Sequence, residues 1–145
     1  EEDHVKAAVR ALGSINIWKV AMKPGKPFLL GEINGKPLLG LPGNPVSTFV
    51  SFFVFAKPFL KATQGLSEVA SNELYGVSSF DFQAGSRREY LRGRHRAEKG
   101  ETLIEKYAHQ GSSVLSSLKW ANCLAIVDAA QQIKIGDPIK FIELN

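Results

Sequence analysis

Residues 41–48, which read LPGNPVST, have the form of a strand end, a tight turn and a helix start. Asn44 suits the N-cap position, where its side chain can accept a bond from a free helix amide. Pro45 then fits the first helical position, because its fixed φ angle is already helical. The amides at 46–48 would point outward from the positive end of the helix, which suits an anion. A well-capped helix without any ligand explains the same residues, and local chemistry alone favours that simpler interpretation.

The helix after this turn is predicted over residues 45–63. It carries five of the nine phenylalanines around most of its circumference, so we expect it to be largely buried. We attribute these rings to core packing and assign them no ligand. The most apolar stretch, 46–60, is interrupted by Ser51 and Lys57, and we expect it to be too short to cross a bilayer.

The segment ahead of the turn predicts one more helix and a small set of strands. Asp3 can cap a helix that stops at Gly13. An Asn34-Gly35 pair is typical of a tight hairpin between two strands. The apolar runs place these strands at 15–20, 28–33 and 37–41.

The composition changes near Gly65, and we expect a boundary between two domains, 1–65 and 72–145, within residues 64–72. The second part contains short alternating segments with frequent glycine and serine, which are typical of strands. One or two helical turns are expected at 114–120, and a turn at 136–138. The pattern therefore predicts an α/β part followed by a small all-β barrel or sandwich. The predicted barrel strands are 74–77, 89–97, 102–106, 124–127 and 139–144.

The composition excludes several classes of protein. Of the 145 residues, 44% are hydrophobic and 22% are charged, as in an ordinary globular chain rather than a disordered or fibrous one. The net charge of +4 comes from residues 1–65, with eight Lys or Arg against four Asp or Glu, which suits a small anion. Three scattered histidines and the single Cys123 predict neither a zinc site nor a disulfide, and no Gly-x-Ser-x-Gly motif is present.

The loop KPGKP, residues 23–27, places two lysines in a restricted backbone. Its two prolines limit the chain and Gly25 permits a sharp turn. Lys23 and Lys26 would be held close together although their charges repel, and an anion such as phosphate or a metal oxyanion would explain this. A solvated turn with two surface lysines explains the spacing equally well.

Residues 87–96 contain five arginines. In a strand, the period of two places one group of arginines on a single face with Tyr90, and Arg87 on the other face. We expect the face with the larger group to be a solvated outer surface. The alternative is an RNA-binding face on which Tyr90 stacks a base. The arginines of this face are Arg88, Arg92, Arg94 and Arg96.

The serines at 112 and 113 precede the short helix predicted after them. Either hydroxyl could cap this helix. The alternative is that a hydroxyl and neighbouring amides are offered to an oxyanion.

Read together, four stretches of the chain resemble the C-terminal part of the molybdopterin molybdenumtransferase (MoeA/gephyrin) family. They are VAMKPGKPFLLGEINGKPLLGLPGNPVSTFVSF, RREYLRGR, QGSSVLSSLKWAN and IKIGDPIKFIEL. The combination of KPGKP with LPGNPVS is specific for that family. The resemblance implies an enzyme of molybdenum cofactor biosynthesis that inserts molybdate into adenylylated molybdopterin and releases AMP. It also implies part of a three-layer molybdopterin-binding domain followed by a C-terminal β-barrel.

The resemblance further implies roles for residues that match the family motifs. Asp3 matches an acidic residue implicated in catalysis and in holding Mg²⁺. The catalytic lysines Lys23 and Lys26, with Pro27, match the molybdate pocket. Arg87 and Ser112 are assigned to the same pocket. The loop on the pterin side is matched by Pro42, Gly43, Asn44, Pro45 and Ser47.

The sequence departs from the family pattern in two ways. Arg88 stands where many relatives have proline, and the glycine-rich turn that should precede Asp3 is absent. We therefore expect a C-terminal fragment that cannot complete the reaction alone.

The resemblance also implies partners and a location. The full-length protein is expected to form a homodimer and to have a molybdopterin adenylyltransferase as a partner. It is expected in the cytoplasm, and neither a nucleic acid nor a membrane is expected as a partner. Two alternatives remain open from the residues themselves: a non-catalytic protein-binding scaffold, and an RNA-binding barrel.

Overall fold

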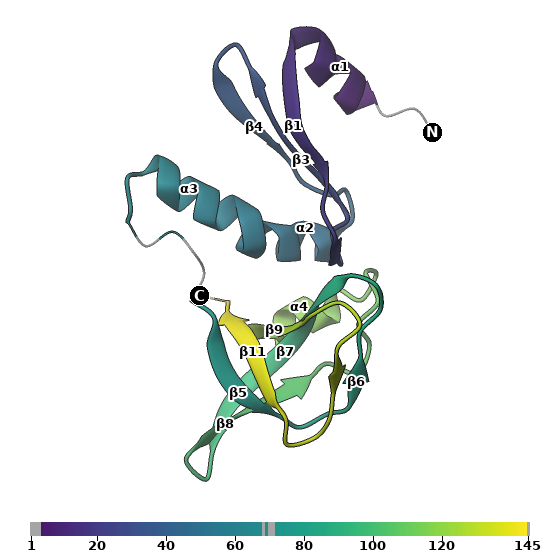
Figure 1. Cartoon of the computed structure of the whole chain (residues 1–145), viewed down its shortest axis with the longest axis vertical. Helices are drawn as coiled ribbons and strands as arrows, with labels where there is room; N and C mark the ends of the chain where they lie inside the picture. The colour runs from purple at the N-terminus through teal and green to yellow at the C-terminus, as the bar shows by residue number, and fades with distance from the viewer. Residues whose placement is uncertain (1–3, 68, 70–71, 145) are drawn as a thin grey trace.

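A computed structural model describes residues 4–67, 69 and 72–144. An N-terminal part with helices and a small sheet lies above a strand-rich barrel (Figure 1). The expected fold class, an α/β part followed by an all-β barrel, is confirmed. The domain boundary expected at 64–72 includes residues 68, 70 and 71, which lie outside the described residues, so its position stays a prediction.

The N-terminal sheet has three antiparallel strands in the order β1-β3-β4. The predicted hairpin at Asn34-Gly35 is confirmed, because both residues have positive φ angles, 51° and 73°, and join β3 to β4. The elements of this part are α1 (His4–Leu12), β1 (Gly13–Lys19), β3 (Pro27–Ile33) and β4 (Lys36–Gly40).

The long helix runs without interruption from Pro45 to Thr63 but is not uniform. It consists of α2 (Pro45–Ser51), a π-helical turn (Phe52–Ala56) and α3 (Lys57–Thr63). Pro58 has no amide hydrogen for the helical ladder, and the π turn lies directly before the Lys57-Pro58 pair.

Two expectations about this helix were wrong. It is not largely buried, because α3 contains no buried residue and Phe52 is 37% exposed. Only part of its circumference packs against other elements, as where the Phe28 and Phe55 rings lie 4.6 Å apart. It is also not too short for a membrane, because its 19 residues, with a mean hydropathy of 1.2, suffice by length and composition. Core helices of soluble proteins meet the same criteria, so we draw no membrane assignment from it.

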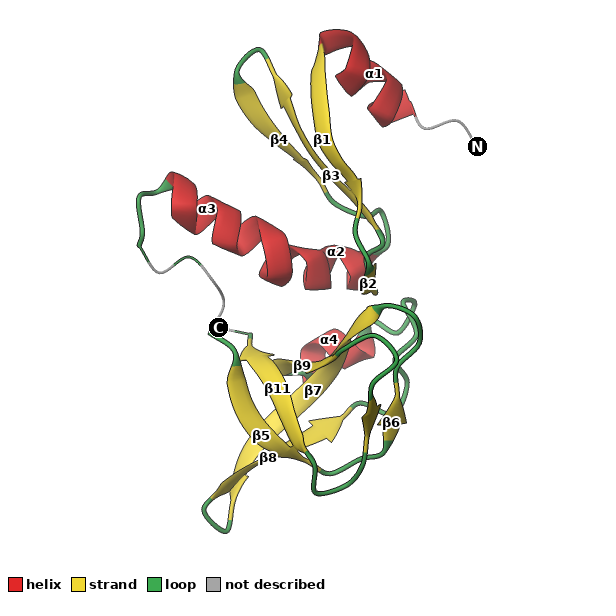
Figure 2. Ribbon diagram, viewed as in Figure 1, coloured by secondary structure: helices red, strands yellow, loops and turns green. Residues whose placement is uncertain are grey.

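The barrel is a six-stranded sheet in the order β2-β7-β8-β5-β11-β9, closed by pairing of β7 with β9 (Figure 2). A two-stranded ladder of β6 and β10 and the helix α4 (Ser116–Trp120) complete it. The five predicted strands are present, whereas β2, β6 and β10, of two residues each, are too short to show a sequence period. The strands are β2 (Met22–Lys23), β5 (Leu74–Ser78), β6 (Phe82–Gln83), β7 (Arg88–Glu98), β8 (Glu101–Lys106), β9 (Cys123–Val127), β10 (Gln132–Ile133) and β11 (Pro138–Glu143).

Two apolar clusters stabilise the molecule. One fills the barrel, where Leu91, Ile104 and Phe141 are each no more than 2% exposed. The other joins the two parts, because Met22 and Val50 from the N-terminal part pack with barrel residues. The barrel residues of this second cluster are Tyr90, Leu124, Ile126 and Ile142.

Candidate functional site

The KPGKP loop emerges directly from β2, the short strand that the N-terminal part adds to the barrel sheet. The Val20 amide donates to the Lys26 carbonyl at 3.1 Å and so closes the loop. Gly25, in the middle of the loop, has φ = 106°, a conformation that favours glycine. The Lys26 side chain is exposed, and no ion pair holds it within the described part of the chain.

Arg87 lies beside this loop because β2 pairs with β7 in parallel, with Met22 opposite Arg88 and Lys23 opposite Glu89. The Arg87 guanidinium donates from Nη1 to the Met22 carbonyl at 3.0 Å. The structure therefore brings the KPGKP loop and the start of β7 together, as expected from the two sequence motifs.

Glu89 is a site residue that sequence reasoning missed. Its side chain is only 6% exposed, and its Oε2 lies 3.1 Å from the Lys23 ammonium. Its Oε1 accepts a bond from the Gly85 amide at 3.0 Å. The signal in the sequence was its position two residues after Arg87, but the pairing that sets it opposite Lys23 is a tertiary feature.

Ser112 lies in an exposed segment before α4. Among the described residues it has no hydrogen bond to either KPGKP lysine or to Arg87. The segment itself is held in place, since the neighbouring Gly111 carbonyl accepts a bond from Arg92 at 3.0 Å. The convergence expected for Ser112 is therefore not seen as a direct contact.

The two serines do not cap α4. The residue at its N-cap is Leu115, and no side chain bonds to the free amides there. The prediction that Ser112 or Ser113 caps this helix was wrong. The helix α4 begins only at Ser116, too far along the chain for either hydroxyl to act as its N-cap.

The prediction that the arginine face of β7 is a solvated outer surface was wrong for part of the strand. Arg92 is 1% exposed, and burial lowers the pKa of its guanidinium. It donates from Nε to Ser117 Oγ at 3.1 Å. Tyr90 on the same face is 8% exposed and packs in the cluster between the two parts, so its ring is not offered to a base. The physical reason is that α4 and the N-terminal part cover this end of the strand.

The other arginines of that face are exposed but occupied. Arg88 lies 2.7 Å from Asp128, and Arg96 lies 3.0 Å from Glu105. Arg94 donates to the Trp120 carbonyl at 2.8 Å. The guanidinium groups that an RNA backbone would need are therefore already engaged in contacts within the protein.

The LPGNP turn has the capped geometry that the sequence predicts. Asn44 Oδ1 accepts bonds from the amides of Val46 at 3.1 Å and Ser47 at 3.2 Å. The Thr48 amide donates to the Asn44 carbonyl at 2.8 Å, so all three amides that an anion could have used are satisfied. The simpler interpretation of a capped helix is therefore confirmed, and the turn presents backbone and apolar surface rather than open amides.

Two hollows flank this turn. A cavity of about 210 Å³ lies on the side of the N-terminal sheet, and a groove of about 600 Å³ lies between the turn and α4. Both include Leu41 and Gly43, so the turn separates them. The cavity is lined by Val5, Trp18, Pro27, Phe28, Leu29, Gly40, Leu41, Pro42 and Gly43, and the groove by Leu41, Gly43, Pro45, Thr48, Phe49, Phe52 and Leu118.

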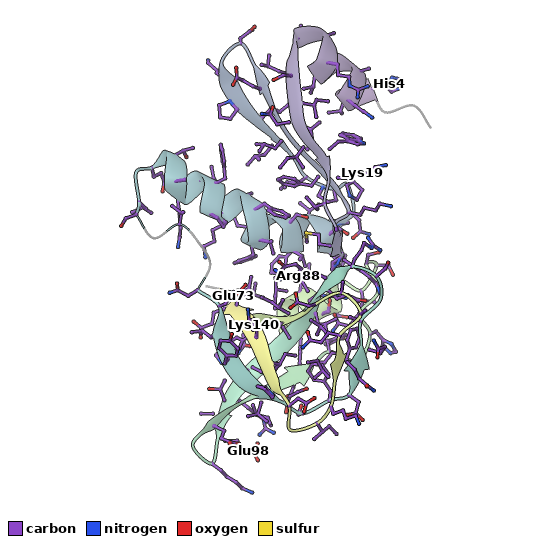
Figure 3. The ribbon with its side chains drawn as sticks, in the orientation of Figure 1. His4, Lys19, Glu73, Arg88, Glu98 and Lys140 are labelled. Carbon is purple, nitrogen blue, oxygen red and sulfur yellow. The ribbon has the colours of Figure 1, made fainter. Side chains whose placement is uncertain are left out.

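The described residues do not form a metal site. They contain no group of three or more His, Cys, Asp or Glu side chains that could hold an ion. Asp3, expected to hold Mg²⁺, lies outside the described residues. His4, the first described residue, lies far from Arg88 at the junction of the two parts (Figure 3). The part of the chain that is described does not fit Mg²⁺.

Two family models match the chain. The probable molybdopterin binding domain matches residues 1–62, and the MoeA C-terminal region, domain IV, matches residues 75–144. Molybdopterin molybdenumtransferase from Haemophilus influenzae is 33% identical over 100% of this chain and 37% of its own length. Molybdopterin molybdenumtransferase 1 from Mycobacterium tuberculosis is 31% identical over 92% of this chain and 33% of its own length.

A solved structure shares the fold. The molybdopterin biosynthesis MoeA protein from Pyrococcus horikoshii superposes with a TM-score of 0.78 at 22% identity, over 97% of this chain and 34% of that one. The chain thus spans about a third of the length of each of these three proteins.

Proposed function

The chain belongs to the MoeA family of molybdopterin molybdenumtransferases, and we propose that it binds molybdate for insertion into adenylylated molybdopterin, with release of AMP. This activity belongs to molybdenum cofactor biosynthesis. Because the chain spans about a third of its relatives, the complete reaction is proposed to need residues outside it, and the chain alone is proposed to be inactive.

The observation that carries the proposal is the pairing of β2 with β7. It places Lys23 and Arg87, which are far apart in sequence, on adjacent segments, with Lys26 at the end of the same loop. Cationic N–H donors that approach from several directions suit a tetrahedral dianion. Ser112 is proposed to add a hydroxyl donor when substrate is bound.

The residues would act by positioning and charge rather than by covalent catalysis. Lys23, Lys26 and Arg87 would hold the oxyanion and stabilise the charge that develops on it. Pro27 contributes to the wall of the cavity next to this loop. The pterin is proposed to lie along the turn that separates the two hollows, which is formed by Pro42, Gly43, Asn44, Pro45 and Ser47.

Several further features belong to this proposal and rest on the family alone. They are a homodimer, a molybdopterin adenylyltransferase partner, a cytoplasmic location and a role of Asp3 with Mg²⁺. No catalytic step is derived through the metal, because the described residues do not form its site.

Calorimetric titration of the chain with sodium molybdate tests the proposal. Lys26→Ala is expected to weaken binding about tenfold or more, the loss of one charge-assisted hydrogen bond. Its melting temperature should stay unchanged, because the exposed Lys26 side chain has no described partner. Arg96→Ala on the barrel is the matched control and should bind like the parent chain. No molybdate binding by the parent chain, or equal binding by Lys26→Ala, would contradict the proposal.

A further inference from the structure

The ion pair between Lys23 and Glu89 crosses from the KPGKP loop to the barrel. We propose that Glu89 is a positioning residue, which orients the Lys23 ammonium for oxyanion binding. This inference rests on the proposed function of the same site and names a further residue within it.

Glu89 is itself held rigidly. Its backbone lies in β7 between two paired strands, opposite Lys23 of β2 and Val127 of β9. Its Oε1 accepts the Gly85 amide bond at 3.0 Å, and its Oε2 faces the Lys23 ammonium at 3.1 Å. Both oxygens are engaged and the residue is 4% exposed, so the carboxylate has little freedom to reorient.

Lys23 is the opposite case, a long and flexible side chain that is 53% exposed. An ammonium carries three N–H donors, and the carboxylate engages only part of this capacity. The remaining donors stay free for a ligand while Glu89 restricts the rotation of the side chain. An anion that binds an already ordered lysine avoids the entropy cost of ordering it.

Lys26 illustrates a lysine of this loop whose side chain is not oriented by such a contact. It belongs to the same loop, but no described carboxylate orients it. The structure thus orients the Lys23 side chain before a ligand binds, whereas the Lys26 side chain would be ordered only by the ligand.

A carboxylate near an anion site also has an opposing effect. Its charge repels an oxyanion, so its removal would tighten binding if charge were all that mattered. If Glu89 positions Lys23, removal of its carboxylate should instead weaken binding. The direction of the change in affinity therefore distinguishes positioning from simple charge repulsion.

The experiment is a calorimetric titration of the chain with molybdate. Glu89→Gln keeps the size of the side chain but removes its charge, and we expect binding to weaken roughly tenfold. Glu89→Asp keeps the charge but withdraws it by one methylene, and we expect binding to weaken as well. Glu73→Gln is the matched control, because it removes the carboxylate of another Lys–Glu ion pair, that of Lys140 on the barrel (Figure 3).

Two further measurements separate positioning from a purely structural role. Hydrogen exchange at the amides of Met22 and Lys23 should be unchanged in Glu89→Gln, which would show that β2 stays paired. In a Lys23→Met background, Glu89→Gln should cause no further weakening, because its positioning effect acts through Lys23.

The outcomes are distinguishable from those for the proposed function. If the parent chain does not bind molybdate, the proposed function fails, and the role of Glu89 fails with it. If the parent chain binds, then unchanged or tighter binding by Glu89→Gln overturns the positioning role alone. Weaker binding together with faster exchange at β2 also overturns it, since Glu89 would then only hold the strand in place.

Discussion

Gly25 of the KPGKP loop lies directly against Ser51 of α2: a Cβ atom at residue 25 would be 2.6 Å from Ser51 Oγ. Ser51 is fully buried, and its hydroxyl has no hydrogen-bond partner among the described residues. The loop that carries both lysines thus rests on the helix that follows the LPGNP turn.

Gly25→Ala should therefore destabilise the protein by about 1–3 kcal/mol, from the positive φ angle and the contact with Ser51. Urea unfolding measures the loss. Gly43→Ala is the matched control, because a Cβ atom there meets nothing within 4 Å. Equal losses in the two variants would contradict the role of the Gly25 contact.

Asn44→Ala should lower the free energy of unfolding by about 1 kcal/mol, because two helix amides lose their acceptor. Asn44→Asp keeps the acceptor and should retain most of the stability. Chemical denaturation of both variants checks this, and an aspartate variant as unstable as the alanine variant would rule out capping as the cause.

Arg92→Met should be destabilising, by about 1–3 kcal/mol for each charge-assisted hydrogen bond that the guanidinium makes. The acceptors are Ser117 Oγ and the Gly111 carbonyl. Hydrogen exchange should also accelerate in residues 109–113, which Arg92 holds in place. Arg96→Met removes only exposed ion pairs and should cost about 0–1 kcal/mol. Unchanged exchange in Arg92→Met would show that the segment is held by other contacts.

Cys123 should make stability fall in alkaline solution. Burial raises the pKa of its thiol to about 12, so the folded protein keeps a proton that the unfolded chain loses above about pH 8.5. The free energy of unfolding should therefore decrease as the pH rises from about 9 towards 12, by up to about 1.4 kcal/mol per pH unit. Urea unfolding near pH 8 and near pH 10 measures this slope, and Cys123→Ala should lack this contribution. A parent chain and variant with identical slopes would contradict it.

Local sequence signals predicted the elements well where the cause was itself local. The Asn34-Gly35 hairpin follows from two residues that accept positive φ angles, and the Asn44 cap from a side chain that bonds two nearby amides. Predictions that depended on distant neighbours did less well. The period of a strand placed Arg92 on an outer face, but whether that face meets water was decided by α4 and the segment before it.

By itself, the sequence determined the order of an α/β part and a barrel, the turns, and the two motifs that carry the candidate lysines and arginine. Only the tertiary structure decided that β2 joins the barrel sheet, that Glu89 faces Lys23, and that Ser112 does not contact the lysines directly. The reason is that φ preferences, capping and hydrophobic period act over a few neighbouring residues. Parallel pairing of residues 22–23 with 88–89 depends on the packing of the whole barrel, and no local pattern encodes it.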